Sequence, residues 1–157
     1  MTTRNCIAKL FLFPAAALFL LLPAAVYAHV SVWPRESTAG ATEKYVVRVP
    51  AEGKVASKSV ELEVPEGVLV EVLSVPTGWK QEVKRNGDHI VGITWLMDIK
   101  PGEFQEFSFV ARNPKDKSQI IWKLRQNFAD GTSVDMTNTP TGVRPNATTK
   151  LAPMKTL

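Results

Sequence analysis

The sequence predicts an all-β protein, an antiparallel β-sandwich with about eight or nine strands. Three observations support this fold class. Short segments alternate apolar and polar residues, turn residues separate these segments, and no stretch has the 3.6-residue periodicity of an amphipathic helix. About 129 residues remain once an N-terminal leader is set aside, which is enough for one domain with a single core.

In the first half, the period of two predicts strands at 30–32, 44–49, 59–64 and 68–73. Gly40 interrupts the chain before the second of these, and Pro65-Glu66-Gly67 is a turn before the fourth. In segment 59–64 the alternation puts Glu61 and Glu63 on one face and the apolar residues on the other. Acids that alternate on a strand are typical of a solvated face.

In the second half, strands are expected at 79–84, 89–96, 104–111, 119–128 and 132–137. The Asn86-Gly87 pair between the first two is the strongest short-range signal for a hairpin. Three phenylalanines in segment 104–111 predict core packing, and Asp130-Gly131 predicts the turn before the last strand. Residues 139–157 are rich in Pro and Thr, and we expect them to form a flexible C-terminal tail after a domain at 29–138.

The N-terminus has the pattern of a secretory signal peptide at residues 1–28. Arg4 and Lys9 precede an apolar run, and Val26-Tyr27-Ala28 provides small or tolerated residues before a cleavage point. An uncleaved membrane anchor is the alternative, but Pro23 makes the end of the run a poor helix continuation. We therefore expect an exported protein, periplasmic or extracellular, whose mature chain begins with His29.

Charge and cysteine content exclude two classes of function. Without the leader, 17 basic and 15 acidic side chains remain, a net charge of +2, and no basic stripe interleaved with aromatics predicts nucleic-acid binding. The single cysteine, Cys6, lies in the leader, so the mature chain has no disulfide or thiolate chemistry.

Signatures of enzymes are scarce in the mature chain. It has two histidines, His29 and His89, and lacks a nucleophile elbow, a phosphate-binding glycine loop and the usual zinc ligand spacings. We expect His89 to be an exposed residue of the hairpin. The sequence therefore predicts a protein that is not an enzyme.

His29 is the residue with the most distinctive chemistry, because cleavage gives it a free amino group. The α-amine and imidazole Nδ1 of one residue can close a chelate ring on a metal, and both release protons near neutral pH. Two nitrogen donors in a rigid chelate suit Cu(II), and a carboxylate from a neighbouring strand would add an oxygen. The alternative is that signal cleavage simply leaves a histidine there.

The sequence resembles the YcnI-like copper-binding domains over nearly all of the mature chain to about residue 138. The resemblance begins with the six residues from His29 to Pro34 directly after the leader and continues through further short motifs: 36–40, 45–50, 60–65, 76–79, 93–95, 102–107 and 122–131. The motifs are short, but their order and spacing together are specific.

This resemblance implies a β-sandwich of the cupredoxin or immunoglobulin type. It also implies one Cu(II) held by the N-terminal histidine in a single-histidine brace, with an acidic ligand and a nearby tryptophan. His29 matches the histidine, and Glu61 matches the acid, although a register shift of two residues would exchange it for Glu63. Met136 stands where the family tryptophan is expected. Its thioether would either bind Cu(I) or fill space in the core. Trp33, on the same strand face as His29 if alternation holds, is a second candidate for the aromatic cover.

The function implied is copper homeostasis or copper delivery outside the cytoplasm, by a monomer that exchanges copper with a membrane copper transporter or another copper chaperone. Two alternatives stay open. One is an extracellular adhesion or assembly module without metal. The other is a copper-dependent redox enzyme of the brace type, which would need His89 beside His29.

Overall fold

The molecule consists of strands in which apolar and polar residues alternate, so that each strand buries one of its faces. The computed structural model describes residues 30–75, 77–136 and 147–154, and twelve strands lie within these ranges. Valines and aromatics point inward from the strands while charged residues point outward, as in β3, where Tyr45, Val47 and Val49 are buried. The predicted β-sandwich is confirmed, with more strands than the eight or nine expected.

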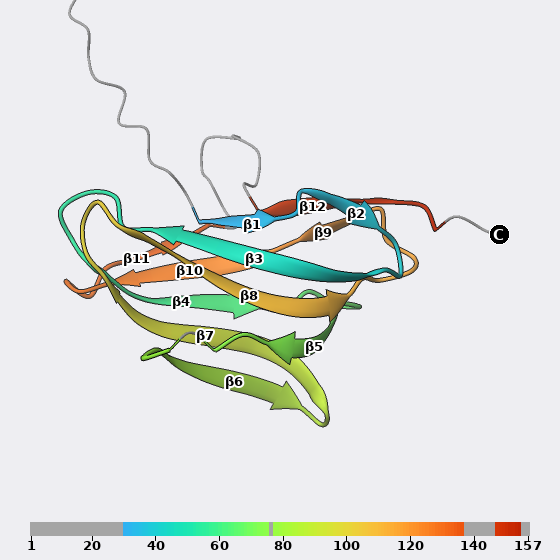
Figure 1. Ribbon diagram of the computed structural model, residues 1–157, viewed down its shortest axis with the longest axis horizontal. Coiled ribbons are helices and arrows are strands. Elements are labelled where there is room, and N and C mark those ends of the chain that lie inside the picture. Colours follow the sequence, from blue (N-terminus) through green and yellow to red (C-terminus); the bar gives the residue numbers. More distant parts are fainter. Residues whose placement is uncertain (1–29, 76, 137–146, 155–157) are drawn as a thin grey trace, which may run out of the picture.

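Two sheets form the body of the sandwich (Figure 1). The four-stranded sheet has the order β1 (Ser31–Trp33), β3 (Thr42–Pro50), β8 (Phe104–Arg112) and β5 (Leu69–Leu73). The five-stranded sheet has the order β11 (Ser133–Asp135), β10 (Lys123–Phe128), β4 (Ser57–Glu63), β7 (His89–Ile99) and β6 (Lys80–Asn86). A three-stranded sheet, β2 (Glu36–Thr38), β12 (Thr148–Ala152) and β9 (Gln119–Ile121), adjoins β1.

The hairpin predicted from Asn86-Gly87 is present as β6 and β7. Asn86 pairs with His89, so the two loop residues are Gly87 and Asp88. Gly87 has a φ of 58°, a left-handed conformation that suits glycine at the first position of a type II′ turn.

The expected strand 119–128 is divided in two at Trp122. β9 pairs with β12, whereas β10 pairs with β4 and β11, and the amide of Trp122 between them donates to the carbonyl of Ala147. The chain thus passes from one sheet to another at Trp122. This change depends on pairing with distant strands, so the alternation within the segment does not predict it.

The expectation of a tail from residue 139 is wrong for residues 148–152, which form β12. This strand is the centre of the three-stranded sheet, antiparallel to β9 and parallel to β2, and it buries Thr149 and Leu151. The parallel pair also departs from an entirely antiparallel sandwich. β2 was missed because three polar residues between Pro34 and Gly40 show no apolar alternation.

A continuous group of aromatic rings fills the space between the sheets. Tyr45 lies 4.7 Å from Trp122 between ring centroids, and Phe109 lies 6.5 Å from Trp95. Trp95 and Trp122 are fully buried, while Trp79 is partly buried against Phe107. The described residues contain no helix with the length and apolar character needed to cross a membrane.

Candidate metal centre

The start of β1 is the described part of the chain nearest in sequence to His29, which itself lies outside the described residues. Val30 and Val32 are completely buried, so Ser31 and Trp33 point outward from the four-stranded sheet. β1 pairs with β3 in the register Ser31 with Arg48 through Trp33 with Val46. The first strand is thus anchored by its inward valines and by a three-residue ladder.

Pro50 lies at the end of β3, two residues beyond the pairing of Arg48 with Ser31. Proline has no backbone N–H, and its carbonyl accepts a hydrogen bond of 2.8 Å from Nε2 of Gln126 on β10. Gln126 is itself buried and also donates to Oγ of Ser57. The end of β3 is therefore fastened to the five-stranded sheet.

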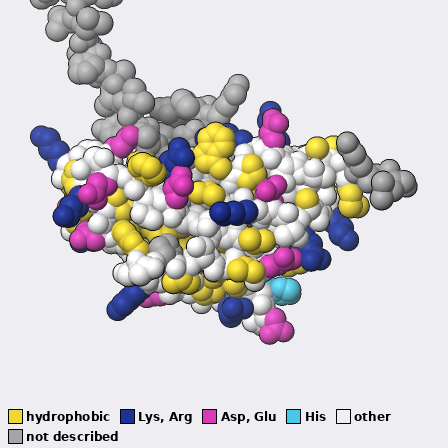
Figure 2. Space-filling view, in the orientation of Figure 1, with side chains coloured by type: hydrophobic (Ala, Val, Ile, Leu, Met, Phe, Trp, Pro, Cys, Tyr) yellow, Lys and Arg dark blue, Asp and Glu magenta, His cyan; other side chains and the backbone are white. Residues whose placement is uncertain are grey.

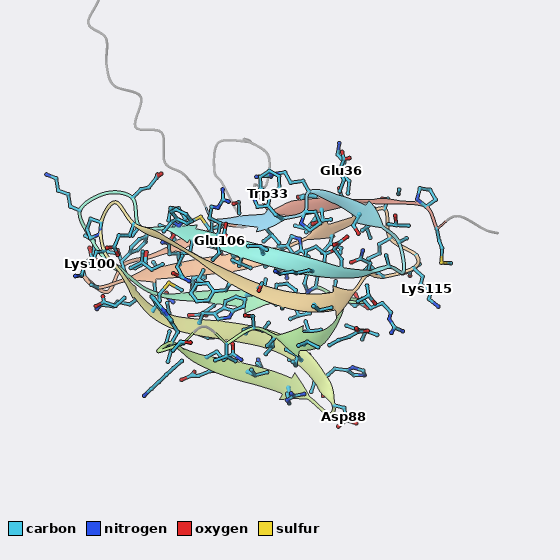
Figure 3. All side chains as sticks on the ribbon, in the orientation of Figure 1. Trp33, Glu36, Asp88, Lys100, Glu106 and Lys115 are labelled. Atoms are coloured by element: carbon cyan, nitrogen blue, oxygen red, sulfur yellow. The ribbon has the colours of Figure 1, made fainter. Side chains whose placement is uncertain are left out.

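Trp33 is exposed on the outer face of the four-stranded sheet, with 44% of its surface accessible. The guanidinium carbon of Arg35 lies 4.8 Å from the centre of its ring, a cation–π arrangement. On the same face Arg48 pairs with Glu106 at 2.8 Å. Figure 3 shows Trp33 and Glu106 on this side of the molecule.

Glu61 and Glu63 project from β4 on the outer face of the five-stranded sheet, as the alternation predicted. Glu61 accepts a hydrogen bond of 2.7 Å from Nδ2 of Asn127, and Glu63 forms a 2.7 Å ion pair with Lys123. Both carboxylates therefore already have partners on the neighbouring strand β10.

A shallow hollow of about 790 Å³ runs over this outer face. Gly92 on β7 contributes no side chain there. The lining extends across the sheet from Asp135 on β11 through Glu61 and Glu63 on β4 to Glu82 and Lys84 on β6. Its lining carries charges of both signs, as expected of a solvated sheet face.

The structure does not bring Trp33 and Glu61 together. Each points outward from its own sheet, and the two sheets pack face to face at a spacing of about 10 Å. An acid at Glu61 and an aromatic cover at Trp33 thus lie on opposite outer faces of the sandwich.

Met136 follows β11 and is buried in the core, with 9% of its surface accessible. Its amide donates to the carbonyl of Leu124 at 2.8 Å, which continues the β10–β11 ladder by one residue. In this position the side chain fills space in the core, one of the two roles expected from the sequence.

His89 is exposed at the end of the β6–β7 hairpin, as predicted. Asp88, the adjacent loop residue, lies on the opposite side of the molecule from Trp33 (Figure 3). The redox-enzyme alternative therefore lacks a second histidine beside β1. Within residues 30–75, 77–136 and 147–154, no group of three or more His, Cys, Asp or Glu side chains is arranged to hold a metal ion.

Two buried polar residues near β1 were missed by sequence reasoning. Thr149 on β12 is completely buried; its Oγ1 donates to the carbonyl of Pro34 at 2.7 Å and accepts from Nε1 of Trp122 at 3.0 Å. The other is Gln126 on β10. The burial of Thr149 could have been predicted from the alternation of Ala147, Thr149 and Leu151, but the Pro- and Thr-rich composition around these residues concealed that pattern.

A third buried polar network lies deeper in the same edge of the sandwich. The Tyr45 hydroxyl donates to Oδ1 of Asn113 at 2.6 Å, and Nδ2 of Asn113 donates to Oγ of Ser37 and to the carbonyl of Thr38. Burial raises the pKa of Tyr45 to about 12, and the nearby Glu43 carboxylate adds to this shift while the side-chain hydrogen bonds oppose it. The phenol is therefore neutral over the physiological range.

The model of a family described as a domain of unknown function, DUF1775, matches residues 29–155. The chain belongs to the DUF1775 family. The match begins at His29 and includes β12, so the family domain extends beyond the boundary at 138. The family resemblance inferred from the sequence motifs is confirmed.

This DUF1775 chain is similar to a protein named for copper binding and to a protein of known structure. The copper-binding protein CutI of Bacillus subtilis (strain 168) is 35% identical over 141 residues, covering 88% of this chain and 68% of CutI. An uncharacterized protein from Nocardia farcinica, whose crystal structure reveals an immunoglobulin-like fold, is 25% identical with a TM-score of 0.66, covering 79% of this chain and 98% of its own. The second likeness agrees with the immunoglobulin-like sandwich described above.

Proposed function

We propose that this DUF1775 protein is an exported copper-binding protein that holds Cu(II) through His29 in a single-histidine brace. The observation that carries the proposal is the family match, which begins at His29 directly after the signal pattern, together with the 35% identity to a protein named for copper binding. The mature amino group and the imidazole of one residue then supply two nitrogen donors.

A chelate of this kind binds Cu(II) only when the amine and Nδ1 are deprotonated. Ordinary pKa values are about 7.7–8.0 for an α-amine and about 6.5 for imidazole, so affinity falls as the pH decreases. A site with few protein ligands leaves coordination positions for water or for a partner's ligand, which suits delivery. We infer that the monomer exchanges copper with a membrane copper transporter or another copper chaperone.

The titration that tests this function compares two forms of the mature protein, one beginning at His29 and one with a single extra glycine ahead of it. We expect the first to bind one Cu(II) tightly, with a nitrogen-rich tetragonal electron paramagnetic resonance spectrum. The second form lacks the free amine on the histidine and should lose the spectrum. Equal, weak binding by both forms would contradict the brace and favour the adhesion or assembly module.

The carboxylate ligand is tested separately by a matched pair, Glu61→Gln and Glu63→Gln. For Glu61 to complete the site, its carboxylate must lie within reach of His29, the single residue ahead of Val30 in the mature chain. In that arrangement Glu61→Gln weakens Cu(II) binding about tenfold and Glu63→Gln leaves it unchanged. The reverse result would assign the ligand to Glu63, and two unchanged affinities would remove both.

Export is tested by expressing the full chain in a bacterial host and sequencing the N-terminus of the secreted or periplasmic product. The proposal expects a product that begins His-Val-Ser-Val-Trp, the sequence from residue 29. A product that retains residues 1–28 would contradict both cleavage and the free amine.

A further inference from the structure

We propose that Asn86, at the end of the β6–β7 hairpin, is a site of spontaneous deamidation, at which the side-chain amide is lost and the backbone rearranges to isoaspartate. This covalent change needs no enzyme and no metal. It is independent of the proposed copper function, and all the residues involved lie in the described hairpin.

The reaction is an attack within the chain. The backbone nitrogen of Gly87 bonds to Cγ of Asn86 as it gives up its proton, and the bond from Cγ to Nδ2 breaks, so that Nδ2 leaves as ammonia. The product is a five-membered succinimide ring. Water from the solvent then opens the ring at either carbonyl, giving aspartate or, where the chain continues through the former side chain, isoaspartate.

Asn86 is exposed as the last residue of β6, and its side chain takes no part in the hydrogen bonds of the described residues. Its pairing with His89 closes the ladder, so only the two loop residues lie beyond it. Figure 3 shows one of them, Asp88, at the outer tip of the molecule. The side-chain amide of Asn86 is thus free to turn toward the next residue.

The next residue offers an accessible nucleophile. The N–H of Gly87 lies in the two-residue loop and donates to no described backbone carbonyl. A Cβ atom placed on Gly87 would meet no atom of a non-adjacent residue within 4 Å. Glycine itself carries no side chain to hinder the approach of its nitrogen, and it has the widest range of backbone conformations. Attack on Cγ of Asn86 therefore meets little steric resistance.

The other two asparagines that the structure describes lack these conditions. Asn113 is buried and precedes Pro114, whose nitrogen carries no hydrogen and cannot attack. Nδ2 of Asn127 donates two hydrogen bonds within the sheet, and the following amide, that of Phe128, donates to the carbonyl of Thr132 at 2.9 Å. These bonds would have to break before the ring could close. Among the described asparagines, Asn86 alone combines an unbound amide with an accessible nucleophile.

Isoaspartate changes the end of the hairpin in two ways. It lengthens the backbone between this residue and the next, and it adds a negative charge near Asp88. The register of a hairpin depends on the length of its loop, so the closing pair of Asn86 with His89 opens. The rest of the ladder, from the pair of Arg85 with Ile90 onward, lies further from the loop and stays paired.

The experiment incubates the folded mature protein at mildly alkaline pH for several weeks and follows it by tryptic peptide mapping. Peptide 86–100 contains a single asparagine, so a gain of about 1 Da in this peptide reports Asn86 alone. A protein isoaspartyl methyltransferase then distinguishes isoaspartate from aspartate. Asn86→Gln is the test variant, because its longer side chain disfavours ring closure, and Asn127→Gln is the matched control.

We expect the gain in mass to appear at Asn86 at least about tenfold faster than at Asn127, which must first give up two side-chain hydrogen bonds. Asn86→Gln should abolish the gain in peptide 86–100, and Asn127→Gln should leave it unchanged. Equal rates at the two asparagines would overturn the proposal. An unchanged peptide 86–100 in the folded protein would also overturn it, and conversion of that peptide after unfolding in guanidinium chloride would then show that the hairpin protects Asn86.

Discussion

Two regions of the sandwich carry the residues that point to copper, and they are built differently. The interior of the sandwich, including the edge where β12 lies beside β1 and β9, holds buried polar groups with protein partners, as Thr149 on β12 and Gln126 on β10 show. The outer face of the five-stranded sheet holds exposed charges such as Glu61, Glu63 and Lys123. Both regions contain polar side chains, but only in the first are these side chains buried.

Buried hydrogen bonds hold a side chain in place in this fold more firmly than exposed ion pairs do. A buried hydrogen bond has no competing water, so its loss costs the desolvation of both partners. An exposed ion pair exchanges with solvent and contributes little to stability. On the face of the molecule shown in Figure 2, charged side chains of both signs are interspersed with hydrophobic ones.

Removal of β12 should have the largest effect. A mature chain ending at residue 146 loses the central strand of the three-stranded sheet and exposes the partners of Thr149 and Leu151. We expect it to show no cooperative thermal transition by circular dichroism, since the loss exceeds a typical net stability of about 5–15 kcal/mol. A chain ending at Met154 is the control and should melt like the parent. A cooperative transition in the shorter chain would show that β12 is dispensable.

Substitutions at two adjacent residues of β10 allow the stabilities of the two regions to be compared directly. Gln126 faces the interior, whereas Asn127, partly buried, hydrogen-bonds to Ser59 and Glu61. Gln126→Leu leaves the Pro50 carbonyl and the Ser57 hydroxyl without this donor and should cost about 2 kcal/mol in urea unfolding, against about 0.5 kcal/mol for Asn127→Leu. Equal losses would mean that burial does not distinguish the two regions.

Tyr45 predicts a pH dependence specific to the interior. Because its folded-state pKa is raised to about 12 from the ordinary value of about 10, its contribution is fully present below about pH 10 and is lost as the pH rises toward 12. The free energy of unfolding of the parent should fall in this window more steeply than that of Tyr45→Phe. Parallel curves for the two proteins in chemical denaturation would contradict the assignment.

The smallest effect is expected on the outer face. Lys123 and Glu63 form an ion pair of 2.7 Å, but 55% and 64% of their side-chain surfaces are exposed. Lys123→Gln should therefore change the free energy of unfolding by at most about 0.5 kcal/mol, and 1 M salt should abolish the difference. A loss above about 1 kcal/mol that persists in salt would place this face in the same category as the buried edge.

The sequence was sufficient for the features that depend on local pattern. Alternation predicted the shared outward face of Glu61 and Glu63, and the turn signal predicted the β6–β7 hairpin. The features it missed depend on distant partners. Trp122 divides β9 from β10 because Ala147 approaches it, and Thr149 is buried because its side chain packs against Trp122 and Pro34. The opposite directions of Trp33 and Glu61 likewise follow from their assignment to different sheets, which strand alternation alone does not determine.

Copper binding at the N-terminal histidine is tested most directly by anomalous X-ray diffraction at the copper edge, on crystals of the mature protein grown with one equivalent of Cu(II). We expect one peak within bonding distance of both the α-amine nitrogen and Nδ1 of His29. A peak in the hollow beside Glu61 and Glu63 with no nitrogen of His29 in contact would contradict it.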